Sequence, residues 1–254
     1  MADRQYLIRA GRRTGPKPSF SADDVVSAAL EIGIDRFTVR QVSARAGVTA
    51  AAIYRLFDSR DAIVSSCLDR AAESLRWPDP QLSWADQLRA WAEACWQLFE
   101  EYPGLDLTLL RVPGAHVHVQ RGMRALIDAL VGQGLSEDEA LFGLDFVGDL
   151  AILTHISVST FRTVGKDGRR GLDAARERFA DVTPDAVLPP DESWVGRAWL
   201  DRKVEFVIAG LDRGLARGTA VDQGADPLGR VSPAGSVAKD RAGGRSVDAP
   251  GSVE

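Results

Sequence analysis

The chain has 254 residues, of which 45% are hydrophobic and 26% are charged, and its formal net charge is −5. This composition is typical of an ordinary soluble globular protein, and the length is ample for a buried core. No apolar run reaches the roughly 18–20 residues that a membrane helix needs, and the polar, basic N-terminus is unlike a signal peptide. We therefore expect a cytoplasmic protein that neither spans nor enters a membrane.

A net charge of −5 argues by itself against a nucleic-acid partner, but the charge is unevenly distributed. Residues 1–60 hold 10 Lys or Arg against 6 Asp or Glu, whereas the remaining residues hold 21 against 30. A basic end on an acidic body orients a molecule toward a phosphate backbone and limits indiscriminate binding. The distribution predicts that one face touches DNA.

Both ends of the chain have the composition of segments without a packed core. Residues 1–18 combine arginines and Lys17 with glycines and prolines, which predicts a flexible basic arm. This arm is either a DNA-contacting segment that follows phosphates or enters a minor groove, or a solvated tail. Residues 218–254 are rich in Gly, Ala, Asp, Ser and Pro without any aromatic residue, which predicts disorder.

A helix is predicted from Ser19 or Ser21, where the segment SADDVVSAALEIGI begins with a cap and two acids. The next segment, TVRQVSARAGVTAAAIYRLF at residues 38–57, has apolar residues at helical spacing on both sides of Gly47. Thr38 and Thr49 each precede a helical run as N-caps, and glycine suits the reversal between the runs. Two short helices joined by a tight turn form a helix-turn-helix, whose second helix commonly enters the DNA major groove.

The outward residues of this motif are suited to DNA. The second helix is expected to expose Thr49, Ala50, Ala51, Ala52, Tyr54 and Arg55. Small residues at its start allow the backbone to approach bases closely, while Arg40 and Arg60 complete a positive rim.

The run TVRQVSARAGVTAAAIYRLFDSRDAIV resembles the DNA-binding segment of tetracycline-repressor-type (TetR family) regulators. The resemblance is strong over about the first 70 residues and extends over the rest only in layout. It implies that Thr38, Tyr54 and Arg60 hold phosphates, and that Arg40, Thr49, Ala50, Ala51 and Arg55 face base edges. The alternative is that these are ordinary surface residues of a helical bundle.

Beyond the motif, periodicity and proline breaks predict a series of further helices. One helix runs to about Leu75 and ends at Trp77-Pro78, and the last is expected to run without a break from Asp191. The segment LDLTLLRVP is either a helix or a buried loop. The other helices are expected at residues 82–102, from about 120 to 132, at 137–161 and at 171–179.

Several residues of the predicted body are candidates to line an apolar ligand cavity, although most aromatic residues of a body are core by default. The candidates are Trp84, Trp91, Cys95, Phe99, His116, Met123, Phe142, Phe146, Asp149 and His155. Asp145 and Asp149 are one helical turn apart in an apolar stretch and either face a cavity or form a polar pair at an interface. Members of the family that bind tetracycline do so through a histidine that follows the helix matching residues 82–102, and this chain has none there.

Other chemistry is poorly supported by the sequence. His116 and His118 lack a third ligand at convincing spacing, so no metal site and no cofactor are expected. Cys67 and Cys95 are interpreted as buried thiols, in preference to a redox pair. No catalytic residue is assigned, because no nucleophile motif or phosphate-binding loop is present.

The sequence therefore predicts an all-α fold with a three-helix, helix-turn-helix head and a helical ligand-binding and dimerisation body. The domain division is residues 19–66 for the head and 67–217 for the body. Its partners are expected to be a second copy of the chain, a palindromic operator duplex and a small-molecule effector that releases the DNA. Two alternatives remain: control by a protein partner, and activation in place of repression.

Overall fold

The computed structural model describes residues 20–182 and 187–215, and this part of the chain contains helices and no β-strand. The all-α prediction is confirmed. The predicted arm at residues 1–18 and the predicted tail at 218–254 lie outside the described residues.

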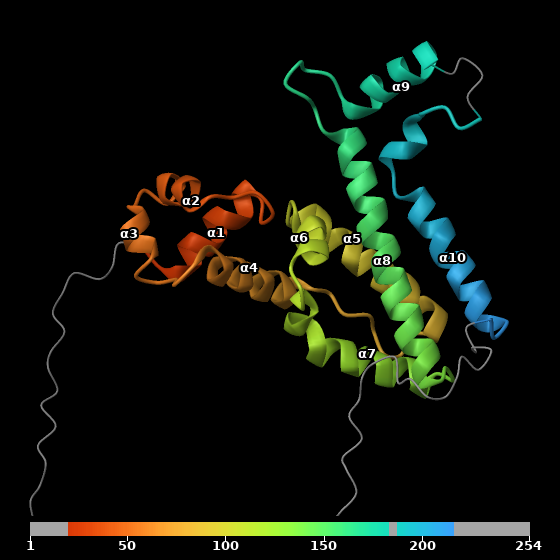
Figure 1. Ribbon diagram of the computed structural model, residues 1–254. Helices are drawn as coiled ribbons and strands as arrows, with labels where there is room; N and C mark the ends of the chain where they lie inside the picture. The colour runs from red at the N-terminus through yellow and green to blue at the C-terminus, as the bar shows by residue number, and fades with distance from the viewer. Residues whose placement is uncertain (1–19, 183–186, 216–254) are drawn as a thin grey trace, which may run out of the picture. The chain divides into compact units, whose positions relative to one another are not determined.

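Four helices form the N-terminal head (Figure 1): α1 (Ala22–Ile32), α2 (Val39–Arg45), α3 (Ala50–Ile53) and α4 (Arg60–Ser74). Polar caps set where these helices begin. Ser21 and Thr38 form capping boxes with Asp24 and Gln41, so two free N–H groups at the start of each of these helices find an acceptor. Phe37 is 1% exposed and lies in the core between the helices.

The body follows with six α-helices and two 3-10 helices in the described residues. They are α5 (Trp84–Glu101), α6 (Leu105–Arg111), η1 (Ala115–Val119), α7 (Gln120–Gly132), α8 (Glu137–Arg162), α9 (Gly171–Val182), η2 (Glu192–Val195) and α10 (Ala198–Asp212). The segment LDLTLLR is therefore a helix and not a buried loop.

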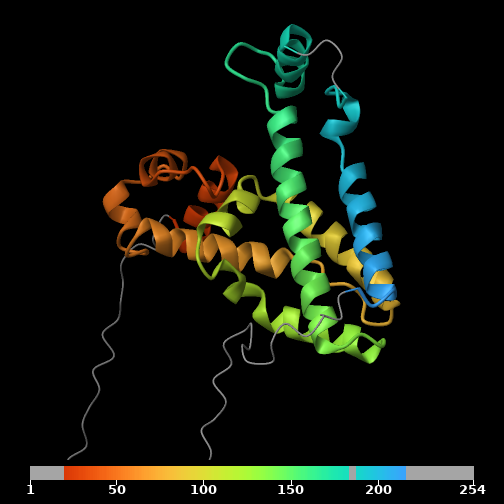
Figure 2. The ribbon, with the colours of Figure 1, turned by 45° about the vertical axis from the view of Figure 1, so that its right-hand side comes forward.

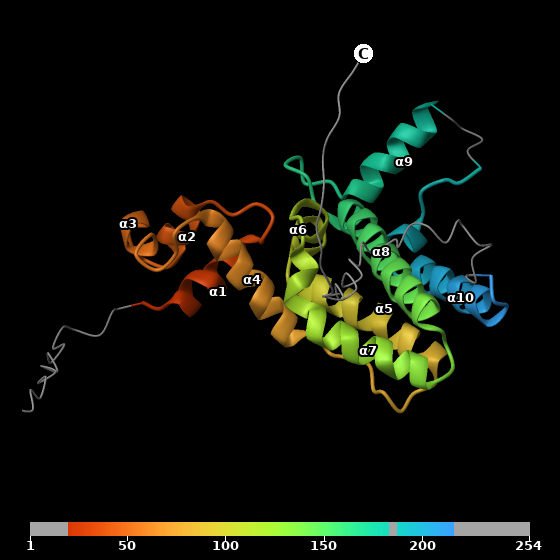
Figure 3. The same ribbon diagram turned by 60° about the horizontal axis from the view of Figure 1, so that its bottom comes forward.

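The core of the body lies between α5, α8 and α10, which pack against one another (Figures 1 and 2). Leu88, Leu144 and Leu200 come from these three helices and are almost completely buried. In Figure 3, α7 leads from η1 to the start of α8 and lies against α5. This packing buries the apolar faces that the sequence periodicity predicted.

Helix α4 contributes to both halves of the described chain. Ile63 and Cys67 lie in the core beside α1, and an ion pair joins Arg70 to Asp23 at 2.9 Å. At the far end of α4, the Ser74 hydroxyl lies 2.6 Å from the Tyr102 hydroxyl of the body. A displacement of α4 therefore changes contacts in the head and in the body together.

Two predicted helices differ from the structure. The last helix is interrupted, because Gly196 adopts an extended backbone between η2 and α10. Trp199 is 43% exposed, and the neighbouring Leu200 is buried. The second helix of the motif was expected to continue through Phe57, but α3 ends at Ile53 and a turn follows.

Helix α8 is, among the described helices, long and apolar enough by composition to cross a membrane, with a mean hydropathy of 1.5. Its packing against α5 and α10 accounts for one apolar side. The other side exposes Phe142, Phe146 and Leu153. A core helix of a globular protein passes the same compositional test, so this helix is weak evidence for a membrane span.

Candidate nucleic-acid interface and ligand cavities

The turn between α2 and α3 is set by local chemistry. Gly47 has a φ of 66°, a left-handed conformation that costs glycine little because it lacks a Cβ. Val48 donates its N–H to the Ser43 carbonyl at 2.9 Å, and the Thr49 hydroxyl accepts from the Ala52 N–H at 3.2 Å. These bonds close the turn and start α3.

Seven of the eight predicted DNA-contacting residues lie exposed on this motif: Thr38, Arg40, Thr49, Ala50, Ala51, Tyr54 and Arg55. The Tyr54 side chain is 51% exposed, a large value for an aromatic residue with no ring partner among the described residues. Arg40 and Arg55 also form no ion pair in the described part of the chain. A phosphate or a base edge can therefore reach them without breaking a contact within the protein.

One predicted exposure on the motif is wrong. Ala52 is only 6% exposed because it faces the head core beside Ile53. Either Leu56 or Phe57 was expected on the apolar face, and Phe57 is the one that is buried. The early end of α3 rotates these positions relative to an uninterrupted helix.

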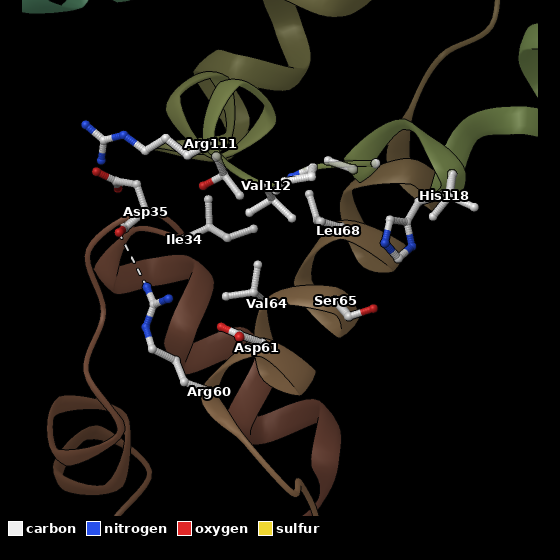
Figure 4. Close-up of a pocket in the computed structure, with 15 residues that line it drawn as sticks. Ile34, Asp35, Arg60, Asp61, Val64, Ser65, Leu68, Arg111, Val112 and His118 are labelled. Carbon is white, nitrogen blue, oxygen red and sulfur yellow. Dashed lines mark hydrogen bonds between the residues drawn. The ribbon is translucent and has the colours of Figure 1, made fainter. Parts of the chain in front are cut away.

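Arg60, the eighth predicted contact, is engaged inside the protein. Its Nε donates to the Phe37 carbonyl at 3.1 Å, its Nη2 donates to the Asp35 carbonyl at 3.4 Å, and its guanidinium lies 4.5 Å from the Phe37 ring centroid. Figure 4 shows the bond to Asp35. These contacts join the α1–α2 link to α4, and the phosphate contact expected of Arg60 stays a prediction.

The predicted cavity residues Trp91, Cys95, Phe99 and His155 are buried in the body. Trp91 donates its indole N–H to the Leu144 carbonyl at 3.1 Å, which ties α5 to α8. Phe99 packs against the His155 ring, with centroids 5.5 Å apart. Trp91 and Cys95 therefore form packed core and line none of the cavities described below.

Both cysteines are free and buried, as the sequence interpretation proposed. Burial raises the pKa of the Cys67 thiol to about 12 and raises the pKa of the Cys95 thiol as well. A protonated, buried thiol is a poor nucleophile and a poor metal ligand.

Phe142, Phe146 and Asp149 lie on the exposed side of α8 and line none of the described cavities, so their assignment as ligand contacts stays a prediction. Phe142 stacks on Phe146 with centroids 5.5 Å apart. Partial desolvation raises the pKa of the Asp149 carboxyl, and the neighbouring charge of Asp145 raises it further. Asp145 and Asp149 were expected either to face a cavity or to form a polar pair at an interface, and their exposed position on α8 favours the interface.

The largest described cavity has a volume of about 980 Å³ and lies in the body between α4, the link after it, and α7. Its wall includes Trp77, which the sequence analysis treated only as part of a helix terminator. None of the predicted ligand contacts lines this cavity. The other lining residues are Asp69, Ala72, Glu73, Pro78, Pro80, His118, Val119, Arg121, Gly122, Ala125, Leu126 and Ala129.

A smaller and more polar cavity of about 470 Å³ includes two of the predicted residues, Phe99 and His155. His155 Nδ1 lies 2.7 Å from Asp106 Oδ2, and both side chains are almost fully buried. Asp106 was not singled out from the sequence because its partner is 49 residues away. Glu100 and Arg162 form an ion pair at the same cavity.

The remaining predicted residues lie apart. Trp84 and Met123 are half-buried beside the core, and His116 is exposed on η1. The His118 ring is hydrogen-bonded to Asp69 at 2.6 Å, a contact that does not involve His116. The described residues contain no group of three or more side chains suited to a metal ion.

The head geometry and the helical body define a helix-turn-helix regulator, and comparison with known proteins agrees. Residues 27–67 match the family model described as bacterial regulatory proteins, tetR family. This match covers the helix-turn-helix, so the head of the chain is similar to the DNA-binding segment of TetR-family transcriptional regulators.

Known relatives extend the similarity beyond the head. The chain is 27% identical over 143 residues to the HTH-type transcriptional repressor DrrR1 of Streptomyces coeruleorubidus, a match that covers 53% of each chain. It thus spans about half the length of that curated relative.

Solved structures share the fold over most of the chain. The Streptomyces coelicolor TetR family protein ActR in complex with actinorhodin has a TM-score of 0.57 at 20% identity, with 77% of this chain and 98% of that chain covered. A TetR variant from Acinetobacter baumannii in complex with minocycline has a TM-score of 0.57 at 18% identity, with 80% and 98% covered.

Proposed function

We propose that this regulator is a cytoplasmic repressor that binds a palindromic operator as a homodimer and leaves it when a small molecule binds the body. The observation that carries the DNA-binding part is the exposed, unpaired set on α2 and α3, with Arg40, Tyr54 and Arg55 at its centre. Arginine is the usual reader of guanine in the major groove, and a phosphate accepts well from a tyrosine hydroxyl.

The dimer part rests on apolar side chains that α8 and α10 leave uncovered. Phe142 is 51% exposed on α8, and Phe206 is 77% exposed on α10. The two helices pack against each other, so their exposed faces belong to neighbouring surfaces. Large exposed apolar side chains on two neighbouring helices favour an interaction site, and a two-fold dimer would pair these helices with their copies as a four-helix bundle.

The effector part rests on the body cavity. Its volume of about 980 Å³ is within the range, up to about 1,000 Å³, that small-molecule sites occupy. Asp69 and Glu73 of α4 belong to its wall, while Val64 and Cys67 of the same helix pack in the head. A ligand that binds more tightly when α4 is displaced would move the two heads away from the spacing of adjacent major grooves. The size of this shift is limited by the difference in the ligand's affinity for the two positions of α4.

The relatives support a ligand-responsive repressor without naming the ligand. One similar structure holds actinorhodin, one holds minocycline, and the curated relative is a repressor. Control by a protein partner is the alternative, because this cavity is partly open to solvent and its lining is both polar and apolar. Activation differs from repression only in where the operator lies relative to the promoter.

The DNA-binding proposal is tested by selecting duplexes from a random pool with the full-length protein and then measuring affinity at several salt concentrations. Selected duplexes should be palindromic, and affinity should fall steeply with salt. Arg40→Ala should weaken binding and relax base preference by about 1–3 kcal/mol at one position of each half-site.

The matched control is Arg178→Ala, which removes the same charge from an exposed position on α9. It should leave affinity and base preference nearly unchanged. Recovery of no preferred duplex, or equal effects of the two substitutions, would refute the assigned interface. Effector control is then tested by adding compounds that bind the protein; if none of them releases the selected duplex, the repressor mechanism is wrong.

A further inference from the structure

A second cavity lies where the head meets the body, apart from the cavity assigned to the effector above. Its volume is about 550 Å³, within the range of about 300–1,000 Å³ typical of small-molecule sites. One wall comes from the link between α1 and α2 and from α4, and the other comes from α6, η1 and the residues between them. Figure 4 shows the side chains of the two walls facing each other.

The floor of this junction cavity is apolar. Ile34, Val64 and Leu68 line it from the head side and are nearly fully buried. Val112 and Val117 line it from the body side, and Val117 is 64% exposed. A partly open cavity with branched aliphatic side chains on both walls suits the ring system of a small apolar molecule.

Two basic groups at the junction cavity are already engaged, and Asp61 is an acid left open to a cationic partner. The Arg60 guanidinium is already bound to the Asp35 and Phe37 carbonyls, and the His118 ring is bonded to Asp69. The Asp61 carboxylate has no partner among the described residues and lies beside Val64 in Figure 4.

The Asp35 carboxylate also has no charged partner in the described part of the chain. It lies so close to Gly104 that a Cβ there would be 1.9 Å from Asp35 Oδ1. Arg111 is the remaining unpaired cation, and its side chain extends away from the apolar floor in Figure 4. Two carboxylates, Asp35 and Asp61, and two guanidiniums, Arg60 and Arg111, line the cavity, so their formal charges balance. The Asp61 carboxylate is the acid that a basic group can reach without breaking a described contact within the protein.

We propose that the junction cavity is a separate binding site for a small aromatic or aliphatic molecule that carries one basic nitrogen. Its apolar part lies on Ile34, Val64 and Val112, and its ammonium group pairs with Asp61. His118 lines both this cavity and the body cavity, so its pair with Asp69 forms part of the partition between them.

Binding at this position holds the head against the body, because the ligand contacts both walls. At present the described chain joins them there through the bond from the Ile34 N–H to the Pro103 carbonyl at 3.2 Å and through the close approach of Asp35 to Gly104. A ligand that adds contacts across the junction changes the free energy of moving α4. An effect of this ligand on operator binding rests on the proposed function, whereas the binding of the ligand itself does not.

The test uses the full-length protein and three fluorescent probes with the same naphthalene ring: dansylcadaverine is cationic, dansylamide is neutral and dansylglycine is anionic. Dansylcadaverine should bind tightest. Asp61→Asn should weaken its binding about threefold to fivefold, the range expected for a partly exposed charge pair, and remove its advantage over dansylamide. Asp138→Asn is the matched control, since both aspartates are exposed second residues of their helices and Asp138 lines no described cavity.

A second pair of variants locates the site. Ser65→Trp places a large side chain in the junction cavity from an exposed position on α4, and Ala125→Trp does the same in the body cavity from α7. Ser65→Trp should abolish dansylcadaverine binding while thermal unfolding stays unchanged, and Ala125→Trp should leave binding intact. The proposal is overturned if dansylcadaverine binding is lost only in Ala125→Trp, or if the protein binds all three probes with equal affinity.

Operator affinity measured without a probe separates this result from the repressor proposal. If no operator is found but the probe pattern holds, the binding site stands and only the proposed function fails. If an operator is found but probe binding is indifferent to Asp61 and Ser65, the junction site fails alone.

Discussion

Trp77 stacks on Trp91 with ring centroids 5.8 Å apart and an angle of 13° between the ring planes. Trp91 is anchored to α8 by its bond to the Leu144 carbonyl, so the position of Trp77 is tied to the body core. Trp77 is also a wall of the body cavity. The stack therefore sets how much room a ligand finds between α4 and α7.

Gly122→Ala tests this packing. A Cβ on Gly122 would lie 2.0 Å from Trp77 Cζ2, so the indole must leave its position on Trp91. We expect a loss of about 1–3 kcal/mol in the free energy of unfolding, measured in urea, as is typical of overpacking. Gly132→Ala, at the end of the same helix and with nothing near its Cβ, should be neutral or slightly stabilising. Equal stabilities of the two variants would show that Trp77 moves freely.

Phe206→Glu tests the dimer surface. The side chain is 77% exposed in one protomer, so the substitution should not unfold the monomer. If the exposed faces of α8 and α10 pair across a two-fold axis, each dimer gains two buried carboxylates and loses two aromatic contacts. Sedimentation equilibrium should then show a dimer dissociation constant raised at least about a hundredfold. Leu110→Glu, on the exposed side of α6, is the control, and a dimer indifferent to Phe206→Glu would place the interface elsewhere.

Arg60→Lys separates a structural arginine from a phosphate contact. Lysine keeps the charge but cannot reproduce the two bonds to the Phe37 and Asp35 carbonyls. We expect the unfolding free energy to fall by about 1–3 kcal/mol while the salt dependence of operator binding is retained. Arg55→Lys, at an exposed arginine without a described partner, should change stability by no more than about 0.5 kcal/mol. Unchanged stability of Arg60→Lys together with weaker operator binding would support the phosphate role.

The buried thiols predict a loss of stability at high pH. Burial raises the pKa of Cys67 from 9.0 to about 12, so between these values the folded chain holds a proton that the unfolded chain has released. The contribution of this thiol to the free energy of unfolding is fully present below about pH 9. It declines as the pH rises toward 12, by at most about 1.4 kcal/mol per pH unit. Urea unfolding of Cys67→Ala at pH 8, 9 and 10 should give a shallower decline than the unsubstituted protein. Parallel pH profiles would mean that Cys67 is not shielded from solvent.

The sequence determined the features that depend on neighbours a few residues apart. Thr38 with Gln41, Ser136 with Glu139 and Gly47 in its turn are short-range interactions, and each lies where the sequence analysis placed a helix end or a reversal. The helix-turn-helix was predictable for that reason, since its pattern is complete within about twenty residues. The all-α class followed from periodicity alone.

Tertiary packing decided which side of each helix is buried by a distant partner. Asp106 meets His155 and Trp77 meets Trp91 only after α5, α6 and α8 have packed, and no local pattern specifies these pairs. Phe142 and Trp91 are equally apolar in sequence, yet one is exposed and the other is core. Residue type predicts a preference for burial, but cavity walls, core and outer surface are assigned by long-range contacts that form only in the folded chain.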